Sequence, residues 1–309
     1  MKKSSFQSLI WIAFYAAFVW ACQKENISKN PTPTQAKMAA KDNAQIVAAT
    51  KTVMNITAGA MGQKGVMGGR ITDGDHPDDG NHPGEGDNED DNDETGCKPS
   101  IKGTFSLDTT HTDSLIYSGS VTIDYGDGST CKDSTHRRTG KITDTYLSII
   151  SFKDSIRFSS TETITFDAFH IDTVQVDGAI IVKSSSNGPT TVETKDAKIT
   201  YADGTFATWS GTLTFQHEKG EGRHWRGKTV KVTGTLTGTN RAGLPFTATI
   251  TKDIVYQFGC FSKHRFIPVS GTVAIAVGGV TSNIDYGDGT CHSHFAITAD
   301  GETEEHEND

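Results

Sequence analysis

Two segments of the chain combine carboxylates, glycines and cysteines at the same spacing, which is a pattern that can bind a cation or form a disulfide. Residues 123–128 have the sequence Ile-Asp-Tyr-Gly-Asp-Gly, and residues 284–289 repeat it without a change. Cysteines flank both copies: Cys97 and Cys131 for the first, Cys260 and Cys291 for the second. Asp tolerates left-handed backbone and Gly favours it, so each copy predicts a strand that ends in a tight turn.

The cysteines on either side of each copy predict two disulfides. Four cysteines allow three connectivities. Their separations, 34 and 31 residues, are similar, and a Gly-Ser-Val or Gly-Thr-Val segment lies between each pair, at residues 119–121 and 271–273. This parallel spacing favours one disulfide across each copy of the motif, Cys97–Cys131 and Cys260–Cys291.

The carboxylates of the motif are also weak candidates for calcium ligands. These are Asp124 and Asp127 in the first copy, and Asp285 and Asp288 in the second. Ca²⁺ takes six to eight oxygen ligands, and each copy supplies only two carboxylates. The turn is therefore the favoured interpretation, and we predict no metal and no cofactor.

The N-terminus has the composition of a secretory signal followed by a lipid attachment site. Lys2 and Lys3 precede an uncharged apolar run at residues 8–21, which ends at Cys22. The run has 14 residues, fewer than the ~20 that a membrane-spanning helix needs. We expect a signal peptide at residues 1–21, lipidation of Cys22, and attachment to a membrane through that lipid.

Charge is concentrated in segments that cannot form a core. The chain has a net charge of −9, and eleven Asp and Glu with no Lys or Arg lie at residues 73–94. Such segments bury too little apolar surface to offset chain entropy. We expect a flexible acidic tether at residues 22–96, with a short helix around 36–53, and a disordered acidic tail at 300–309. No basic surface is indicated, which argues against nucleic acid as a partner.

Residues 97–299 have the pattern of a single all-β domain. Apolar and polar residues alternate in short segments, which is typical of half-buried antiparallel strands, and Asp-Gly and Asn-Gly pairs supply the turns. The alternating segments include residues 119–125, 164–166, 171–176, 230–236, 246–250 and 273–277. We expect one antiparallel domain, either a sandwich or an extended meander.

Two tryptophans near predicted turns are the candidates for ligand contact. Trp225 lies between Arg223 and Arg226 in a basic, aromatic loop, and Trp209 lies farther upstream. Such residues can stack on a sugar ring or anchor a protein partner. The alternative is that each is half-buried in the sheet.

Three resemblances add to these expectations. Residues 19–22, Val-Trp-Ala-Cys, resemble a bacterial lipobox, and the Gln-Lys-Glu that follows resembles the surface-export signal of Bacteroidota lipoproteins. Residues 124–128 are similar to the Asp-Phe-Gly-Asp-Gly turn of polycystic-kidney-disease domains, which are immunoglobulin-like sandwiches. That resemblance is confined to the turn, because Ile123 and Ile284 stand where the family usually has Trp. Over residues 97–300 the chain resembles Bacteroidota outer-membrane lipoproteins with an acidic spacer and paired Gly-Asp-Gly and Cys motifs, which implies no particular activity.

The sequence thus favours a lipid-anchored protein of the outer membrane, exposed at the cell surface. No catalytic motif is present, and we expect a binding or adhesion module for a glycan or a protein, not an enzyme. The alternative is an envelope-assembly or carrier lipoprotein that faces the periplasm and holds an apolar ligand. Exposed aromatic residues at loop ends would favour the first hypothesis, and a continuous apolar sheet face would favour the second.

Overall fold

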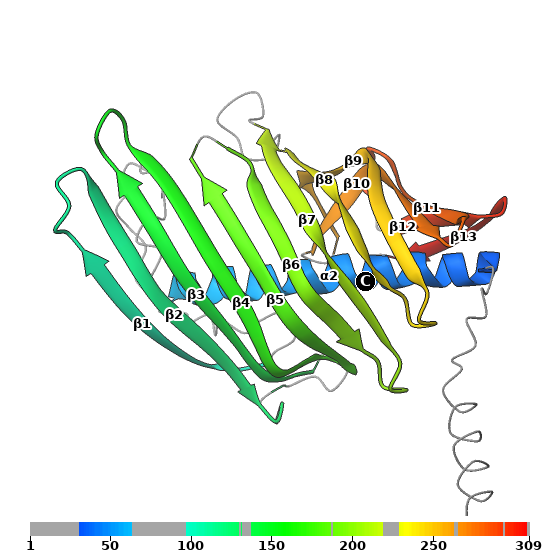
Figure 1. Ribbon diagram of the computed structural model, residues 1–309, viewed down its shortest axis with the longest axis horizontal. Helices are drawn as coiled ribbons and strands as arrows, with labels where there is room; N and C mark the ends of the chain where they lie inside the picture. Colours follow the sequence, from blue (N-terminus) through cyan, green and yellow to red (C-terminus); the bar gives the residue numbers. More distant parts are fainter. Residues whose placement is uncertain are drawn as a thin grey trace, which may run out of the picture. The chain divides into compact units, whose positions relative to one another are not determined.

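Within the described residues, thirteen antiparallel strands form one sheet, and the helix α2 (Pro33–Gln63) lies on one of its faces (Figure 1). The computed structural model describes residues 31–63, 97–129, 131, 137–186, 188–218, 229–262, 265–292 and 294–307. The strands are β1 (Ser100–Asp108), β2 (Ser114–Gly126), β3 (Arg138–Ser151), β4 (Arg157–Ile171), β5 (Val174–Ser185), β6 (Thr190–Thr200), β7 (Phe206–Glu218), β8 (Thr229–Thr239), β9 (Pro245–Ser262), β10 (Arg265–Val277), β11 (Val280–Asp288), β12 (His294–Ala299) and β13 (Glu302–Glu307). Each strand pairs with its neighbours in the sequence. The all-β prediction is confirmed, in its meander form.

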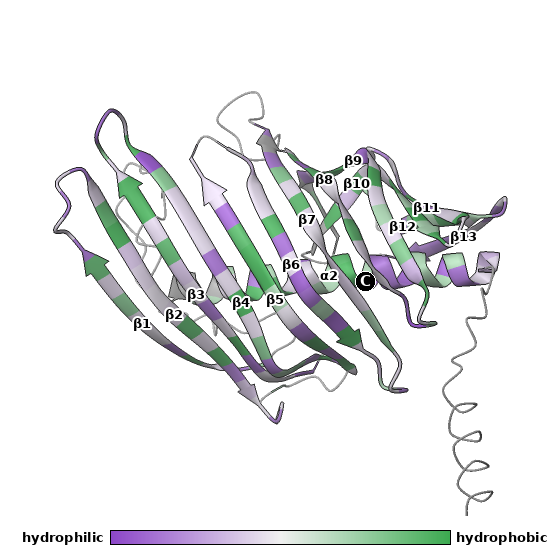
Figure 2. Ribbon diagram, viewed as in Figure 1, coloured by the Kyte–Doolittle hydropathy of each residue, from purple (hydrophilic) through white to green (hydrophobic). Residues whose placement is uncertain are grey.

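The period-two pattern divides the sheet into a buried and an exposed face. In β3, for example, Ile142, Asp144 and Tyr146 are buried, while Lys141 and Thr145 at alternate positions are exposed. Figure 2 shows the same alternation of apolar and hydrophilic residues along the other strands. We call the buried side the inner face, because the helix packs against it.

The helix α2 (Pro33–Gln63) covers the inner face. It begins with a capping box, in which the Gln35 amide donates to the Thr32 hydroxyl at 3.3 Å and the Thr32 amide donates to the Gln35 side chain at 2.9 Å. Pro33 occupies the first helical position, where its missing N–H costs nothing. The helix packs against β2, β10, β11 and β12, so it joins the two halves of the sheet.

One stripe of α2 is buried along its whole length. The stripe recurs every three or four residues and consists of Ala36, Ala39, Asn43, Ile46, Thr50, Val53, Thr57 and Ala60. Thr50 and Thr57 tolerate burial because their hydroxyls donate to carbonyl groups of the preceding turn. The alanines let the helix axis approach the sheet closely. Core side chains at the start of the helix pack on β6–β12, and those at its end pack on β1–β6.

The predictions of a flexible tether at residues 22–96 and of a disordered tail at 300–309 are wrong in part. Residues 33–63, expected within the tether, form the buried helix α2, which is longer than the short helix predicted at 36–53. Within the predicted disordered tail at 300–309, residues Glu302–Glu307 form β13 and pair with β12. Lys37 and Lys41 of the helix neutralise part of its charge, because both form ion pairs with Glu304. The acidic segment at 73–94 and the signal peptide lie outside the described residues.

The repeated motif lies at two different places in the meander. The first copy ends β2 and the second ends β11. The Gly-Ser-Val segment at residues 119–121 is on the same strand as its motif, but the Gly-Thr-Val segment at 271–273 is on β10, the hairpin partner of β11. The two segments are therefore not equivalent, and only the motif and the flanking cysteines repeat.

Candidate functional site

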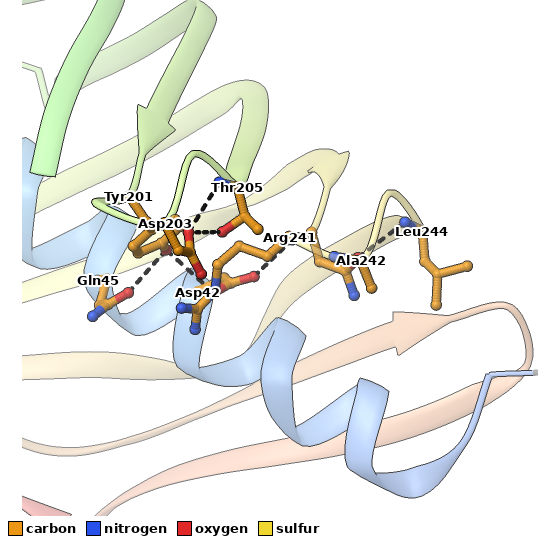
Figure 3. A network of polar contacts seen from close by, with 9 residues as sticks. Asp42, Gln45, Tyr201, Asp203, Thr205, Arg241, Ala242 and Leu244 are labelled. Atoms are coloured by element: carbon orange, nitrogen blue, oxygen red, sulfur yellow. Dashed lines mark hydrogen bonds and ion pairs between the residues drawn. The ribbon is translucent and has the colours of Figure 1, made fainter.

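A buried carboxylate on α2 fastens the helix to two turns of the sheet (Figure 3). Asp42 is 0% exposed. Its Oδ1 lies 2.7 Å from Nε of Arg241, and its Oδ2 accepts the backbone N–H of Arg241 at 3.0 Å. The Tyr201 hydroxyl lies 3.2 Å from the same Oδ1 and 2.9 Å from Oε1 of Gln45. We call Asp42, Gln45, Tyr201 and Arg241 the helix latch.

The latch is held in shape by its own turns. Asp203 accepts hydrogen bonds from the amide and hydroxyl of Thr205, which fixes the β6–β7 turn next to Tyr201. Asn240 fixes the β8–β9 turn, because its Oδ1 accepts the amides of Ala242 and Leu244. The Arg241 guanidinium in this turn stacks 4.1 Å from the centre of the Tyr201 ring. Burial and the Asp42 charge raise the pKa of Tyr201. Tyr201 therefore stays a protonated donor, and the latch has a structural role.

A pair of carboxylates, Asp144 and Glu162, lies on the inner face, on adjacent strands. Asp144 of β3 is opposite Ile164, and Glu162 of β4 is opposite Tyr146, so the two acids are diagonal neighbours. Asp144 is 0% exposed, and no described residue gives either of its carboxylate oxygens a hydrogen bond. Glu162 accepts a weak hydrogen bond from Ser160 at 3.4 Å.

The surroundings of this pair favour its protonated form. Burial raises the pKa of Asp144 from 3.8 to about 7, and the charge of Glu162 adds to the rise. Burial also raises the pKa of Glu162, which its hydrogen bond from Ser160 partly offsets. Two acids with raised pKa values in one place are typical of catalytic sites. However, a substrate cannot contact Asp144 in this structure, because the side chain has no exposed surface.

The four aspartates of the repeated motif cap their own turns. Asp124 and Asp285 each accept the amide two residues ahead, from Gly126 and Gly287, at 2.9 Å. Asp127 and Asp288 do the same for residues 129 and 290, and these hydrogen bonds lower the pKa of both acids. The motif thus has the geometry of a structural turn. Among the described residues, no three His, Cys, Asp or Glu side chains gather as a metal would require.

The two disulfides pair as the spacing predicts. Cys97 is bonded to Cys131, and Cys260 is bonded to Cys291. The first bond joins the two ends of the β1–β2 hairpin. The second joins Cys260, on β9, to Cys291, just after β11, so the loop that it closes contains the β10–β11 hairpin. The two bonds therefore hold the first hairpin and the last part of the sheet in register.

The aromatic candidates have different outcomes. Trp209 is buried in the core among β6–β12 and is not an exposed binding residue, because it faces inward at its position on β7. Trp225, Arg223 and Arg226 lie outside the described residues, as does Cys22.

Exposed large apolar side chains gather in the first part of the sheet. Of the seven that the described residues contain, six lie between residues 105 and 158: Phe105, Leu107, Leu147, Phe152, Ile156 and Phe158. Phe206 of β7 is the seventh. The β3–β4 hairpin loop carries the most exposed of them, Ile156 at 78%, with Phe152 on the same loop and Phe158 directly after it. We call Phe152, Ile156 and Phe158 the β3–β4 tip.

Sequence reasoning did not find the latch, the buried acids or the apolar tip. The latch joins residues 199 positions apart, and no local sequence pattern predicts such a contact. The burial of Asp144 could have been predicted, because this residue alternates with polar residues in the same period as the buried Ile142 and Tyr146. For Phe152 and Ile156 no turn was predicted from the sequence, and the β3–β4 loop that exposes them is seen only in the structure.

No helix among the described residues is both long enough and apolar enough to cross a membrane. Comparison of the chain with protein-family models, with curated proteins and with solved structures finds no match.

Proposed function

We propose that the protein is a lipid-anchored, non-enzymatic binding protein of the outer membrane that holds a protein partner through the β3–β4 tip. The single observation that supports binding at this place is the exposure of three apolar side chains at one hairpin end. Exposed apolar patches on monomers commonly mark interaction sites. Aromatic side chains such as Phe152 and Phe158 provide large contact area at low entropic cost.

The alternative, a carrier for an apolar ligand, has less support. The inner face of the sheet has the apolar lining that such a carrier needs, but α2 occupies it from Ala36 to Ala60. A ligand could enter only after the latch between Asp42 and Arg241 had opened. The apolar tip needs no such rearrangement.

Anchoring and orientation are tested first, on intact cells that produce the full chain with a C-terminal tag. Proteinase K is added outside the cells, and a periplasmic protein is monitored as a control. Loss of the tag while the control survives supports a surface module. Protection of the tag until the outer membrane is broken contradicts surface exposure and favours the periplasmic alternative.

Binding through the tip is tested by photo-crosslinking in the same cells. A photoreactive phenylalanine analogue replaces Ile156, and in a matched control it replaces Lys195, whose side chain is 57% exposed on β6. A discrete adduct with a foreign protein at Ile156 but not at Lys195 supports the proposal. Equal adducts at both positions, adducts only with a second copy of the chain, or none, contradict it.

A further inference from the structure

The two edges of the sheet differ in how they are protected. Edge strands expose unpaired backbone groups, and proteins usually protect them with charge. β13 follows this rule, because four of its six residues are Glu. β1 does not: seven of its nine residues are exposed, and its charges are only Lys102 and Asp108. Within the described part of the chain, β1 pairs with β2 alone.

β1 also presents apolar side chains on the inner face, beyond the strands that α2 covers. Phe105 lies opposite Gly119 and Leu107 lies opposite Tyr117. Phe105 is 53% exposed and Leu107 is 44% exposed. A free edge and exposed apolar residues thus occur on the same strand.

The free backbone groups of β1 can be assigned to particular residues. The carbonyl oxygen of Thr104 accepts the Tyr146 hydroxyl at 3.3 Å, and the Thr104 hydroxyl accepts the Ser120 amide at 3.2 Å. Thr104 therefore directs its hydrogen-bonding groups toward β2. These groups alternate sides along a strand, so those of Gly103 and Phe105 point away from β2, on the side where no described strand pairs with β1.

We propose that two copies of the chain pair through β1, antiparallel, about a two-fold axis at Thr104. This register is the one that pairs all nine residues of β1 and keeps both inner faces on the same side. The pairs across the interface are Ser100 with Asp108, Ile101 with Leu107, Lys102 with Ser106, Gly103 with Phe105, and Thr104 with its own counterpart. A closed two-fold interface of this kind uses the same patch on both copies.

The side chains of β1 complement one another in this register. The Phe105 ring lies opposite Gly103, which has no side chain to obstruct it, and Ile101 meets Leu107. On the other face, Lys102 lies diagonally across from Asp108 of the second copy, within reach of its long side chain. The only two charges of the strand thus attract across the interface. A second copy therefore fits this edge by shape and by charge, and this surface is separate from the β3–β4 tip.

Cysteine crosslinking in intact cells tests the register. At the two-fold axis the Thr104 residues form a pair without mutual backbone hydrogen bonds, with their Cα atoms about 4.5 Å apart, which suits a disulfide. In Thr104→Cys we expect a reducible band at twice the chain mass after mild oxidation. Ser106→Cys is the matched control, because the two copies of that residue are offset by four positions, or about 13 Å. Equal crosslinking of both variants, or of neither, overturns the proposal.

Sedimentation of the purified full-length chain tests the association without a crosslink. Phe105→Lys places a charge opposite Gly103, and we expect the dimer Kd to rise at least about tenfold. Phe206→Lys is the control, since Phe206 is similarly exposed, at 50%, but lies away from the edge; its Kd should not change. Far-UV circular dichroism verifies that both variants fold. A wild-type chain that stays monomeric at about 100 µM, or equal weakening by both variants, overturns the proposal.

Discussion

Replacement of Asp144 by Asn should stabilise the protein, and the gain should depend on pH. The folded pKa of Asp144 is about 7, against 3.8 for an unburied Asp. Between these two values the folded state keeps a proton that the unfolded state has lost, so the free energy of unfolding falls as pH rises. The full difference corresponds to roughly 4 kcal/mol. Between pH 5 and pH 8 the loss in the wild type is roughly 3 kcal/mol.

The amide side chain of the Asp144→Asn variant does not ionise, so this loss should disappear from the variant. Urea unfolding followed by tryptophan fluorescence, to which the buried Trp209 contributes, measures the effect. The gain of the variant over the wild type should be roughly 3 kcal/mol larger at pH 8 than at pH 5, a difference in midpoint of about 1 M urea. Any slope that remains belongs largely to Glu162, whose pKa burial also raises. Asp167→Asn, at an exposed position of β4, is the control. If Asp144→Asn and the wild type lose stability in parallel from pH 5 to pH 8, the assignment of a buried proton to Asp144 is refuted.

The remaining predictions concern the latch, a glycine and a disulfide. Asp42→Ala should lower the free energy of unfolding by about 2–4 kcal/mol, because it leaves the Arg241 charge partly buried without its partner. Amide hydrogen exchange should accelerate in α2 more than in the strands, and equal acceleration in both would contradict a latch. Gly119→Ala should lower the free energy of unfolding by about 1–3 kcal/mol, because a Cβ there meets the Tyr146 hydroxyl and the Thr104 carbonyl. Gly103→Ala is the control: a Cβ at that position makes only ordinary contacts, and its thermal unfolding should be nearly that of the wild type. Replacing the cysteines of the 34-residue Cys97–Cys131 loop with Ser should lower the free energy of unfolding by about 3–4 kcal/mol; a loss below about 1 kcal/mol would mean that the unfolded chain is already constrained there.

The all-β fold was predictable because its evidence is local. Alternation along segments such as residues 119–125 needs only the pleat of a strand, and the spacing of the cysteines reflects the closure of one hairpin. The choice between a sandwich and a meander was not predictable, since it depends on which strands pair. Residues 302–307 were predicted to be disordered because their strand also depends on contacts with residues far away in the sequence. Their charge is tolerated in a strand because Lys37 and Lys41, far away in the sequence, lie beside Glu304.

The length of the helix was underestimated because its buried stripe is interrupted by polar residues. Asn43, Thr50 and Thr57 occupy positions where a helical pattern normally shows Leu or Ile. Thr50 and Thr57 can be buried because their hydroxyls donate to carbonyl groups of the preceding turn, which the residue types alone do not reveal. The burial of Asp42 could not be predicted either, because its partner Arg241 lies 199 residues away in the sequence and only the fold brings the two together.

The position of α2 at the start of the chain has a consequence for the order in which the molecule is completed. Every strand pairs with the strand made just before it, so the sheet can extend hairpin by hairpin as the chain is synthesised. The helix is made before the thirteen described strands, yet the Ser282 hydroxyl that donates to the Ala36 carbonyl comes 246 residues later. The ion pair of Lys37 with Glu304 comes later still. The helix therefore gains these contacts only after β11 and β13 have been synthesised, and they link the first of the described elements to the last.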